Sequence, residues 1–101
     1  MCYYIRGLVR EAYRFFFPKK NLKTFSDLEF DMHNSWAHLK FENGYGVSVI
    51  TGGYGSKDEP YELAVLKNDK ICYSTPITDD VIGYLTAEEV TKYMAKIQYL
   101  F

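Results

Sequence analysis

The chain has 101 residues, of which 48% are apolar and 18% aromatic, and its formal charge is −1. A single domain of this length buries roughly 65% of its unfolded surface, so we expect one core that needs no disulfide or metal to fold. Charged side chains interrupt residues 1–17, so neither a secretory signal peptide nor a membrane-spanning helix is predicted there. Cys2 and Cys72 fit neither a disulfide scaffold nor a zinc knuckle, so the expected location is a reducing cytoplasm.

Residues 1–17 are predicted to form an amphipathic helix that ends before Pro18. Apolar side chains recur there at three- and four-residue steps, and arginines follow one another at one-turn spacing on the other side. A basic linker, residues 19–23, follows the proline. The basic residues of the whole segment are Arg6, Arg10, Arg14, Lys19, Lys20 and Lys23.

The charge of the chain is divided unevenly. Residues 1–23 hold six basic side chains against Glu11, a net charge of +5, so the total of −1 leaves −6 for residues 24–101. Such a division concerns partners and association rates rather than fold. The simpler interpretation of the arginine row is the solvated face of a helix that packs on the sheet, and the alternative is a binding surface.

Two stretches of alternating residues predict the first strands of an antiparallel sheet. Apolar and acidic residues alternate over residues 28–32, and apolar and polar residues alternate over residues 36–41. In the second stretch, one face would carry Ala37, Leu39 and Phe41. The opposite face would carry Trp36, His38 and Lys40. The residues between the two stretches favour a turn.

Residues 44–51 are predicted to be the central strand. They are rich in valine, isoleucine and threonine, and the pair Asn43-Gly44 supplies the positive φ angles of a tight hairpin turn. The strands after it continue a β-meander. The remaining predicted elements of the sheet are a glycine-rich hairpin loop at residues 52–60, a strand at 61–66, a turn at 67–70 and a short strand at 71–74.

The last predicted element is a helix that begins with a capping box. The Thr86 hydroxyl can accept the backbone N–H of Glu89, whose side chain can reach back to the cap. The apolar stripe of this helix consists of Val90, Tyr93, Met94, Ile97 and Phe101. We expect the stripe to cover the sheet face that carries Val47, Val49, Leu63 and Val65.

The predicted fold class is therefore α+β. It is a four- or five-stranded antiparallel β-meander with an N-terminal helix and a C-terminal helix packed on the sheet. The chain is predicted to form one domain, residues 1–101. Residues 1–23 are its basic helix and linker, and residues 24–101 are the sheet with the C-terminal helix.

Three runs of residues resemble a family of small uncharacterised proteins carried by bacteriophages and prophages. The runs are FENGYGVSV at residues 41–49, YELAVL at 61–66 and CYSTPITDDVIGYLT at 72–86. The resemblance implies a phage accessory protein that acts in the host cytoplasm, of the kind that inhibits host or antiviral defence machinery, as anti-CRISPR proteins do. The family has no known activity that assigns a role to a residue, and the basic helix lies outside the matching runs.

No group of residues in the sequence predicts an enzyme, a metal site or a cofactor site. The glycine-rich run at 51–57 lacks the Gly-Lys-Ser/Thr ending and the following helix of a phosphate-binding loop. The acidic pairs at 79–80 and 88–89 are better explained as helix caps than as catalytic carboxylates, the first pair capping a short helical turn ahead of Gly83. The candidate metal ligands, which match no zinc spacing, are Asp31, His33, His38 and Cys72.

The sequence favours a non-enzymatic protein-binding module, because aromatic residues are in surplus and the charge is divided. The predicted partner is a host or defence-system protein, contacted through Tyr45, Tyr54, Asp79 and Asp80. The alternative is a nucleic-acid-binding accessory protein that uses Arg6, Arg10, Arg14, Lys19 and Lys20. No membrane contact is predicted, and the oligomeric state is left open.

Overall fold

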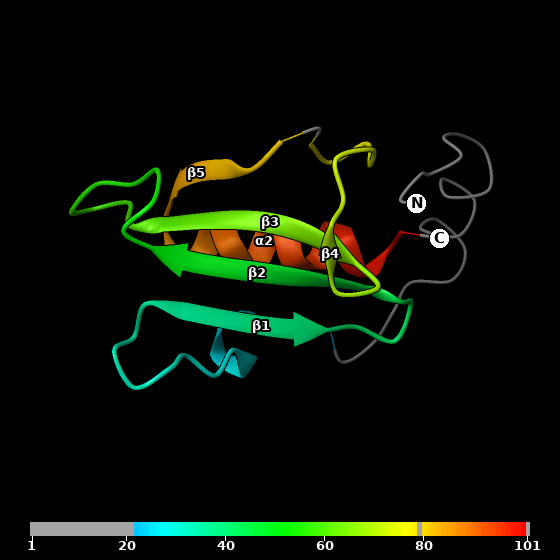
Figure 1. The fold of residues 1–101 in the computed structure, drawn as a ribbon, viewed down its shortest axis with the longest axis horizontal. Helices are drawn as coiled ribbons and strands as arrows, with labels where there is room; N and C mark the ends of the chain where they lie inside the picture. The colour runs from blue at the N-terminus through cyan, green and yellow to red at the C-terminus, as the bar shows by residue number, and fades with distance from the viewer. Residues whose placement is uncertain (1–21, 79, 101) are drawn as a thin grey trace.

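The computed structural model describes residues 22–78 and 80–100, and these residues form a five-stranded antiparallel sheet with one helix packed on it (Figure 1). The elements are the 3-10 turn η1 (Phe25–Asp27), the strands β1 (Trp36–Lys40), β2 (Tyr45–Thr51), β3 (Tyr61–Lys67), β4 (Lys70–Ile71) and β5 (Ile82–Leu85), and the helix α2 (Ala87–Gln98). The α+β class and the C-terminal helix are confirmed. The predicted N-terminal helix lies outside the described residues. No helix within the described ranges is long and apolar enough to cross a bilayer.

The strand β2 is central, as the sequence predicts. It pairs with β1 on one side and with β3 on the other, both antiparallel. The turn before β2 depends on Gly44, whose φ of 88° is a left-handed value that glycine adopts without steric cost. The Phe41 N–H closes the turn by donating to the Tyr45 carbonyl at 2.8 Å. The predicted hairpin is therefore confirmed, but only Gly44 of the pair has a positive φ, and Asn43 does not adopt the positive φ that the sequence predicts.

The other edge of β3 is shared by two short strands. At one end, β4 follows a tight turn in which Asn68 and Asp69 have φ values of 54° and 65°, and Asn and Asp tolerate such values better than most residues. At the other end β3 pairs with β5. The strand β4 ends at Ile71 and is shorter than the predicted strand at 71–74, although the Cys72 N–H still donates to the Val65 carbonyl at 2.7 Å.

The strand β5 lies where the sequence predicts a short helical turn ahead of Gly83, so that prediction is wrong. Ile82 pairs with Leu63 and Leu85 pairs with Tyr61, with an irregular register between them. Within the described part of the chain, the Asp80 carboxylate accepts only the N–H of its neighbour Val81 and caps no helix. The edge of β3 needs hydrogen-bond partners, and a segment distant in sequence supplies them in place of a local turn.

Residues 28–32 form no strand, contrary to the prediction. The Asp31 carboxylate accepts the backbone N–H groups of Ser35 at 2.7 Å and Trp36 at 3.2 Å, which folds this region into a turn. Leu28 is buried and Phe30 packs against the core cluster. The alternating pattern therefore reflects the burial of Leu28 and Phe30 and not strand pairing, and it ends at Met32, which is exposed in the turn.

The hydrogen bonds of Asp31 give this turn a pH-dependent stability. The Ser35 backbone N–H is the main cause that holds the pKa of the Asp31 carboxyl below its ordinary value of 3.8, and the Ser35 hydroxyl and the Trp36 N–H act in the same direction. Because the folded pKa is the lower one, the stabilisation is present above the ordinary value and is lost as the pH falls through the folded value. When the pH is lowered from about 5 to about 2, the free energy of unfolding of Asp31→Asn, measured by urea titration, should fall less than that of the parent.

The control for this experiment is Asp58→Asn. Asp58 is exposed in the loop between β2 and β3. This variant should keep the acid dependence of the parent. An Asp31→Asn variant that loses stability as steeply as the parent would show that the carboxylate does not hold the turn.

The core lies between the sheet and α2, which lies behind β2 and β3 in Figure 1. The helix contributes the fully buried side chains of Val90, Met94 and Ile97. The sheet contributes Val47, Val49, Leu63 and Val65, which confirms the predicted face. The capping box is also confirmed, since the Glu89 N–H donates to the Thr86 hydroxyl at 3.2 Å and the Glu89 carboxylate accepts the Thr86 N–H at 3.0 Å.

Two polar side chains hold the C-terminal end of α2. The Asn43 Nδ2 group donates to the carbonyls of Ile97 at 2.9 Å and Leu100 at 3.0 Å, while its Oδ1 accepts the Tyr45 N–H. Asn43 therefore joins the turn before β2 to the last turn of the helix. Gln98 is buried and exchanges two hydrogen bonds with the backbone of Lys23.

The strand β1 forms an edge of the sheet, and polar groups limit its pairing with other chains. The Trp36 N–H donates to the Asp31 carboxylate, and the Trp36 carbonyl accepts the Asp31 N–H at 2.9 Å. Lys40 places a charge near the other end of the strand, a common protection against edge-to-edge association. The open length of this edge is therefore short.

Candidate functional site

Large apolar side chains are exposed at six positions among the described residues, and four of these lie at one end of the molecule. The four are Met32, Trp36, Tyr54 and Tyr84, here called the aromatic end. They belong to the turn before β1, the start of β1, the loop between β2 and β3, and the last part of β5. All four segments lie toward the left of Figure 1, the first two below β2 and the other two above it. Their exposed fractions range from 46% for Trp36 to 89% for Met32. Exposed apolar groups gathered in this way are typical of interaction sites.

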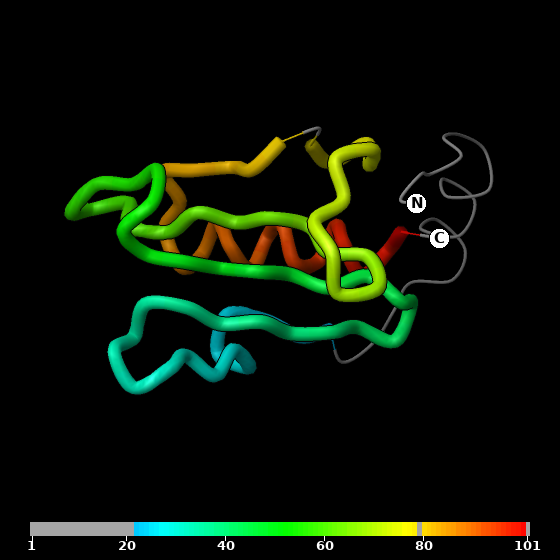
Figure 2. The backbone as a smooth tube through the Cα atoms, viewed as in Figure 1, coloured from blue at the N-terminus to red at the C-terminus, as the bar shows by residue number. Residues whose placement is uncertain are grey.

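The loop at residues 52–60 is folded back against β5, which gives Tyr54 a defined position (Figure 2). The Tyr54 carbonyl accepts the Tyr84 N–H at 2.8 Å, and the Tyr54 N–H donates to the Glu62 carboxylate at 2.8 Å. Gly83 makes this approach possible, because a Cβ atom at that position would lie only 2.5 Å from the Tyr54 Cβ. The two tyrosines therefore form one ordered unit.

Tyr84 has a strained backbone. Its φ of 57° lies in the left-handed region, which an aromatic residue enters at a cost of about 1–2 kcal/mol. Asparagine or glycine would adopt this conformation with less strain. Strained residues are concentrated at functional sites. The strain and the exposed ring together single out Tyr84 within the aromatic end.

Trp36 is held by its neighbour His38 and is connected to Tyr54 across the sheet. The Trp36 Nε1–H group donates to His38 Nε2 at 2.9 Å, and the two ring centroids are 4.2 Å apart. Trp36 pairs with Ile50 in β2, and Ile50 pairs with Glu62 in β3. Since Glu62 binds the Tyr54 N–H, a continuous row joins the two aromatic residues. This row lies on the open face of the sheet, the face opposite α2.

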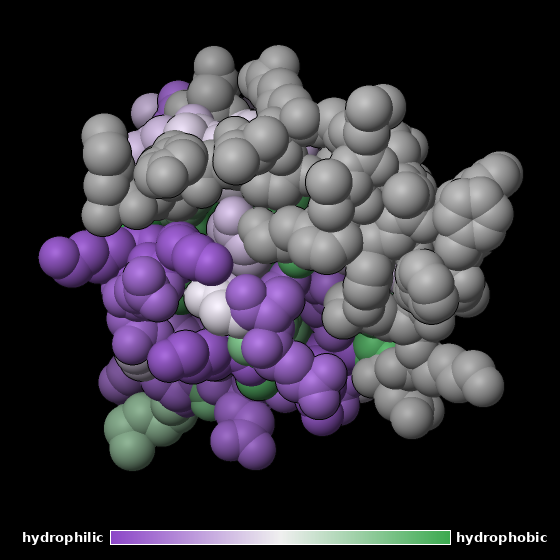
Figure 3. All heavy atoms as spheres, turned by 90° about the vertical axis from the view of Figure 1, so that its right-hand side faces the viewer, coloured by the Kyte–Doolittle hydropathy of each residue, from purple (hydrophilic) through white to green (hydrophobic). Residues whose placement is uncertain are grey.

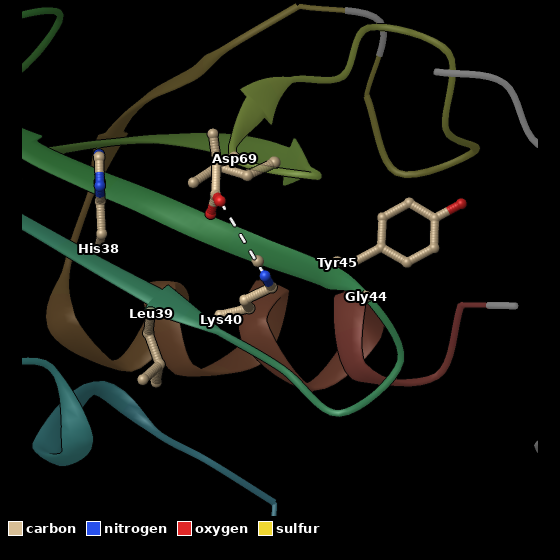
Figure 4. Close-up of a pocket in the computed structure, with 8 residues that line it drawn as sticks. His38, Leu39, Lys40, Gly44, Tyr45 and Asp69 are labelled. Carbon is tan, nitrogen blue, oxygen red and sulfur yellow. Dashed lines mark ion pairs between the residues drawn. The ribbon is translucent and has the colours of Figure 1, made fainter. Parts of the chain in front are cut away.

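A shallow hollow of about 80 Å³ lies on the open face near the turn between β1 and β2 (Figure 4). Lys40 and Asp69 lean toward each other across it, with 4.0 Å between their charged groups. His38 lies on the same side of β1 as Lys40, whereas Leu39 points to the other side. Ligand pockets typically measure about 300–1,000 Å³, so this hollow is too small to enclose a substrate.

The end of the molecule opposite the aromatic end has a different surface. Among the described atoms visible there, hydrophilic residues predominate and hydrophobic ones form separate spots (Figure 3). This end contains the turn between β1 and β2 and the strand β4. Two of the six exposed large apolar residues, Ile71 and Tyr73, nevertheless lie outside the aromatic end, at the end of β4 and just after it.

The structure separates the residues that the sequence predicts as a partner-binding set. Tyr54 lies exposed in the aromatic end. Tyr45 is only 1% exposed, with Lys67 Nζ at 4.1 Å from its ring centroid, so its side chain presents almost no surface to a partner. Asp80 is exposed but precedes the far end of β5. Outside the described residues lie Asp79, Arg6, Arg10, Arg14, Lys19 and Lys20.

The structure does not bring the candidate metal ligands together. Among residues 22–78 and 80–100, no three His, Cys, Asp or Glu side chains are grouped as a metal site. Cys72 is buried and disulfide-bonded, so it provides no thiolate. This bond differs from the reduced cysteines expected from the sequence.

Sequence reasoning missed three members of the aromatic end, Met32, Trp36 and Tyr84. The alternation of residues 36–41 places Trp36 on the outer face, and an outward tryptophan near a strand end is the signal that could have selected it. No comparable signal marks Tyr84, because its position depends on the pairing of β5 with β3. No family model, curated protein or solved structure matches the chain.

Proposed function

We propose that this protein is a non-enzymatic binding module that engages a partner protein through the aromatic end. The observation that carries the proposal is the gathering of Met32, Trp36, Tyr54 and Tyr84 at one end of an ordered sheet. Methionine, tyrosine and tryptophan are enriched at the centre of protein interfaces. Charged residues of the same loop, Lys57, Asp58 and Glu59, are exposed beside them and would form a polar rim.

The class of partner follows from the resemblance to phage accessory proteins. A host protein or an antiviral defence protein is the proposed target, met in the host cytoplasm. A reducing cytoplasm would open the disulfide of Cys72. We therefore also propose that the apolar core between the sheet and the helix holds the aromatic end in place when this bond is reduced.

The test is capture of the partner from bacterial host lysates by the tagged chain, with mass spectrometry as the readout and with reductant present or absent. The parent should enrich one protein. The double variant Tyr54→Ser with Tyr84→Asn should lose at least about tenfold of that enrichment, since hot-spot aromatic residues contribute 2 kcal/mol or more. Asparagine is chosen because it tolerates the left-handed backbone at position 84.

Tyr73→Ser is the matched control, because Tyr73 is also about half exposed but lies outside the aromatic end. It should capture the partner as the parent does. Two results would refute the proposal: no enriched protein in lysates from several hosts, or an enriched protein that the double variant retains in full.

Gly83→Ala tests whether the order of the loop matters for binding. The added Cβ would meet the Tyr54 Cβ and carbonyl oxygen, at 2.5 and 2.6 Å, and would push the loop away from β5. We expect the Tyr84 amide to lose its hydrogen-exchange protection, because its acceptor is the Tyr54 carbonyl. Capture of the partner should weaken in the same variant. Full protection of that amide would show that the loop does not depend on Gly83.

The alternative function, nucleic-acid binding through the basic residues of segment 1–23, is supported by its net charge of +5. Fluorescence titration with single- and double-stranded oligonucleotides distinguishes it from the first proposal. Binding that weakens steeply with salt and is lost in Arg10→Ala with Arg14→Ala would favour the alternative. Binding that responds instead to Tyr54 and Tyr84 would favour the aromatic end.

A further inference from the structure

The contact between Trp36 and His38 depends on the protonation state of the histidine. An indole N–H can only donate a hydrogen bond, and an imidazole nitrogen can accept one only when it carries no proton. The Trp36 Nε1 atom lies 2.9 Å from His38 Nε2, and the rings meet edge to face at 67°. His38 must therefore be neutral, with its proton on Nδ1, for this contact to exist.

We infer that protonation of His38 releases the Trp36 indole, so that the orientation of this exposed side chain depends on pH. When Nε2 carries a proton, its own N–H faces the indole N–H. Two donors then stand where a donor and an acceptor stood before, and they repel each other. The indole then has to turn away, toward water. Where the inference concerns partner binding, it rests on the function proposed above.

The surroundings of His38 contain no group that would replace the indole. From β2 the residue that pairs with His38 is Ser48, which is uncharged. Lys40 on β1 and Asp69 between β3 and β4 share the hollow with His38, and these two pair with each other. Among the described residues, no carboxylate lies within ion-pair distance of the imidazole. Protonation therefore breaks one contact without forming a new ion pair in its place.

Protonation of His38 therefore changes how mobile the Trp36 side chain is in the unbound protein. With neutral His38 the indole is fixed, and a partner that fits this orientation does not have to immobilise it. With protonated His38 the ordering cost of about 0.5–1.5 kcal/mol for a mobile side chain falls on the binding step. Binding through Trp36 should therefore be weaker in acid.

Tryptophan fluorescence tests the inference directly, because Trp36 is the only tryptophan in the chain. Emission intensity and acrylamide quenching are measured on the whole chain between about pH 5 and pH 8, the range in which histidine side chains commonly titrate. The parent should show one sigmoidal step, with greater acrylamide quenching on the acid side. His38→Gln should lose the step, because the glutamine carbonyl can accept the indole N–H and does not titrate in this range.

His33→Gln is the control, since His33 is the only other histidine and lies in the turn before β1. It should retain the step of the parent. A parent without a step, or an unchanged step in His38→Gln, would overturn the inference. These measurements use the isolated chain, so their failure leaves the partner proposal standing, and a failed capture experiment leaves this inference standing.

Discussion

Ile97→Ala is expected to lower the free energy of unfolding by about 2–5 kcal/mol. Ile97 is fully buried in the core between α2 and the sheet, in the same cluster as Val90 and Met94 of the helix. Alanine leaves a cavity that the surrounding strands can fill only in part. A domain of this size has a total stability of about 5–15 kcal/mol, so the loss is a large part of it. Urea titration followed by far-UV circular dichroism measures the change.

The control for the core is Thr86→Ala, which removes the confirmed helix cap and leaves the packing intact. Its expected cost is about 1 kcal/mol. The two variants separate a loss of packing from a loss of capping in the same helix. If Ile97→Ala unfolded at the same urea concentration as the parent, α2 would not pack on the sheet as described.

Asn43→Asp is expected to be the second most damaging change, at about 1–3 kcal/mol. The amide of Asn43 donates to the carbonyls of Ile97 and Leu100, and an ionised carboxylate cannot donate. It would face two carbonyl oxygens at the C-terminal end of α2, which already carries partial negative charge. Hydrogen exchange should show the last turn of the helix opening more often, and thermal unfolding should report the loss of stability.

Asn68→Asp is the matched control, because Asn68 also lies in a tight turn of the sheet but is exposed in the turn between β3 and β4. Aspartate tolerates its left-handed backbone, so the stability should change by less than about 0.5 kcal/mol. Equal effects at the two positions would show that the link between Asn43 and the helix does not contribute. The loss of stability in Asn43→Asp would then come only from placing an aspartate in a turn.

The sequence by itself determines the elements whose signals lie in a few consecutive residues. Asn43 and Gly44 predict a hairpin because the turn preference of such a pair does not depend on the rest of the chain. Thr86 and Glu89 announce a helix start because the capping box closes within one turn. The buried faces of β2, β3 and α2 can be predicted in the same way, because apolar residues recur every second position in the strands and every three or four positions in the helix. These local features are sufficient for the α+β class and for the sheet face that the helix covers.

The same local patterns are insufficient where a side chain or a distant segment supplies the backbone hydrogen bonds. Residues 28–32 show the period of a strand, but Asp31 folds the chain into a turn and the segment packs without pairing. The region before Gly83 has turn chemistry, but the edge of β3 draws it into β5. In the first case a local side chain competes with strand pairing for the backbone N–H groups. In the second case a tertiary contact outweighs local preference, because a backbone group that leaves water has to find a partner.

The tertiary structure alone decides the candidate site. Tyr54 and Tyr84 are thirty positions apart in the sequence, and they meet because the Tyr84 N–H donates to the Tyr54 carbonyl beside Gly83. The sequence gives the same reason to select Tyr45 as to select Tyr54. Tyr45 is nevertheless buried, because its position in β2 places its side chain on the core side of the sheet. A tyrosine in a sequence does not say whether its ring faces the core or the solvent. That outcome depends on which strands pair and which loop is folded back, and both are set by contacts between residues far apart in the chain.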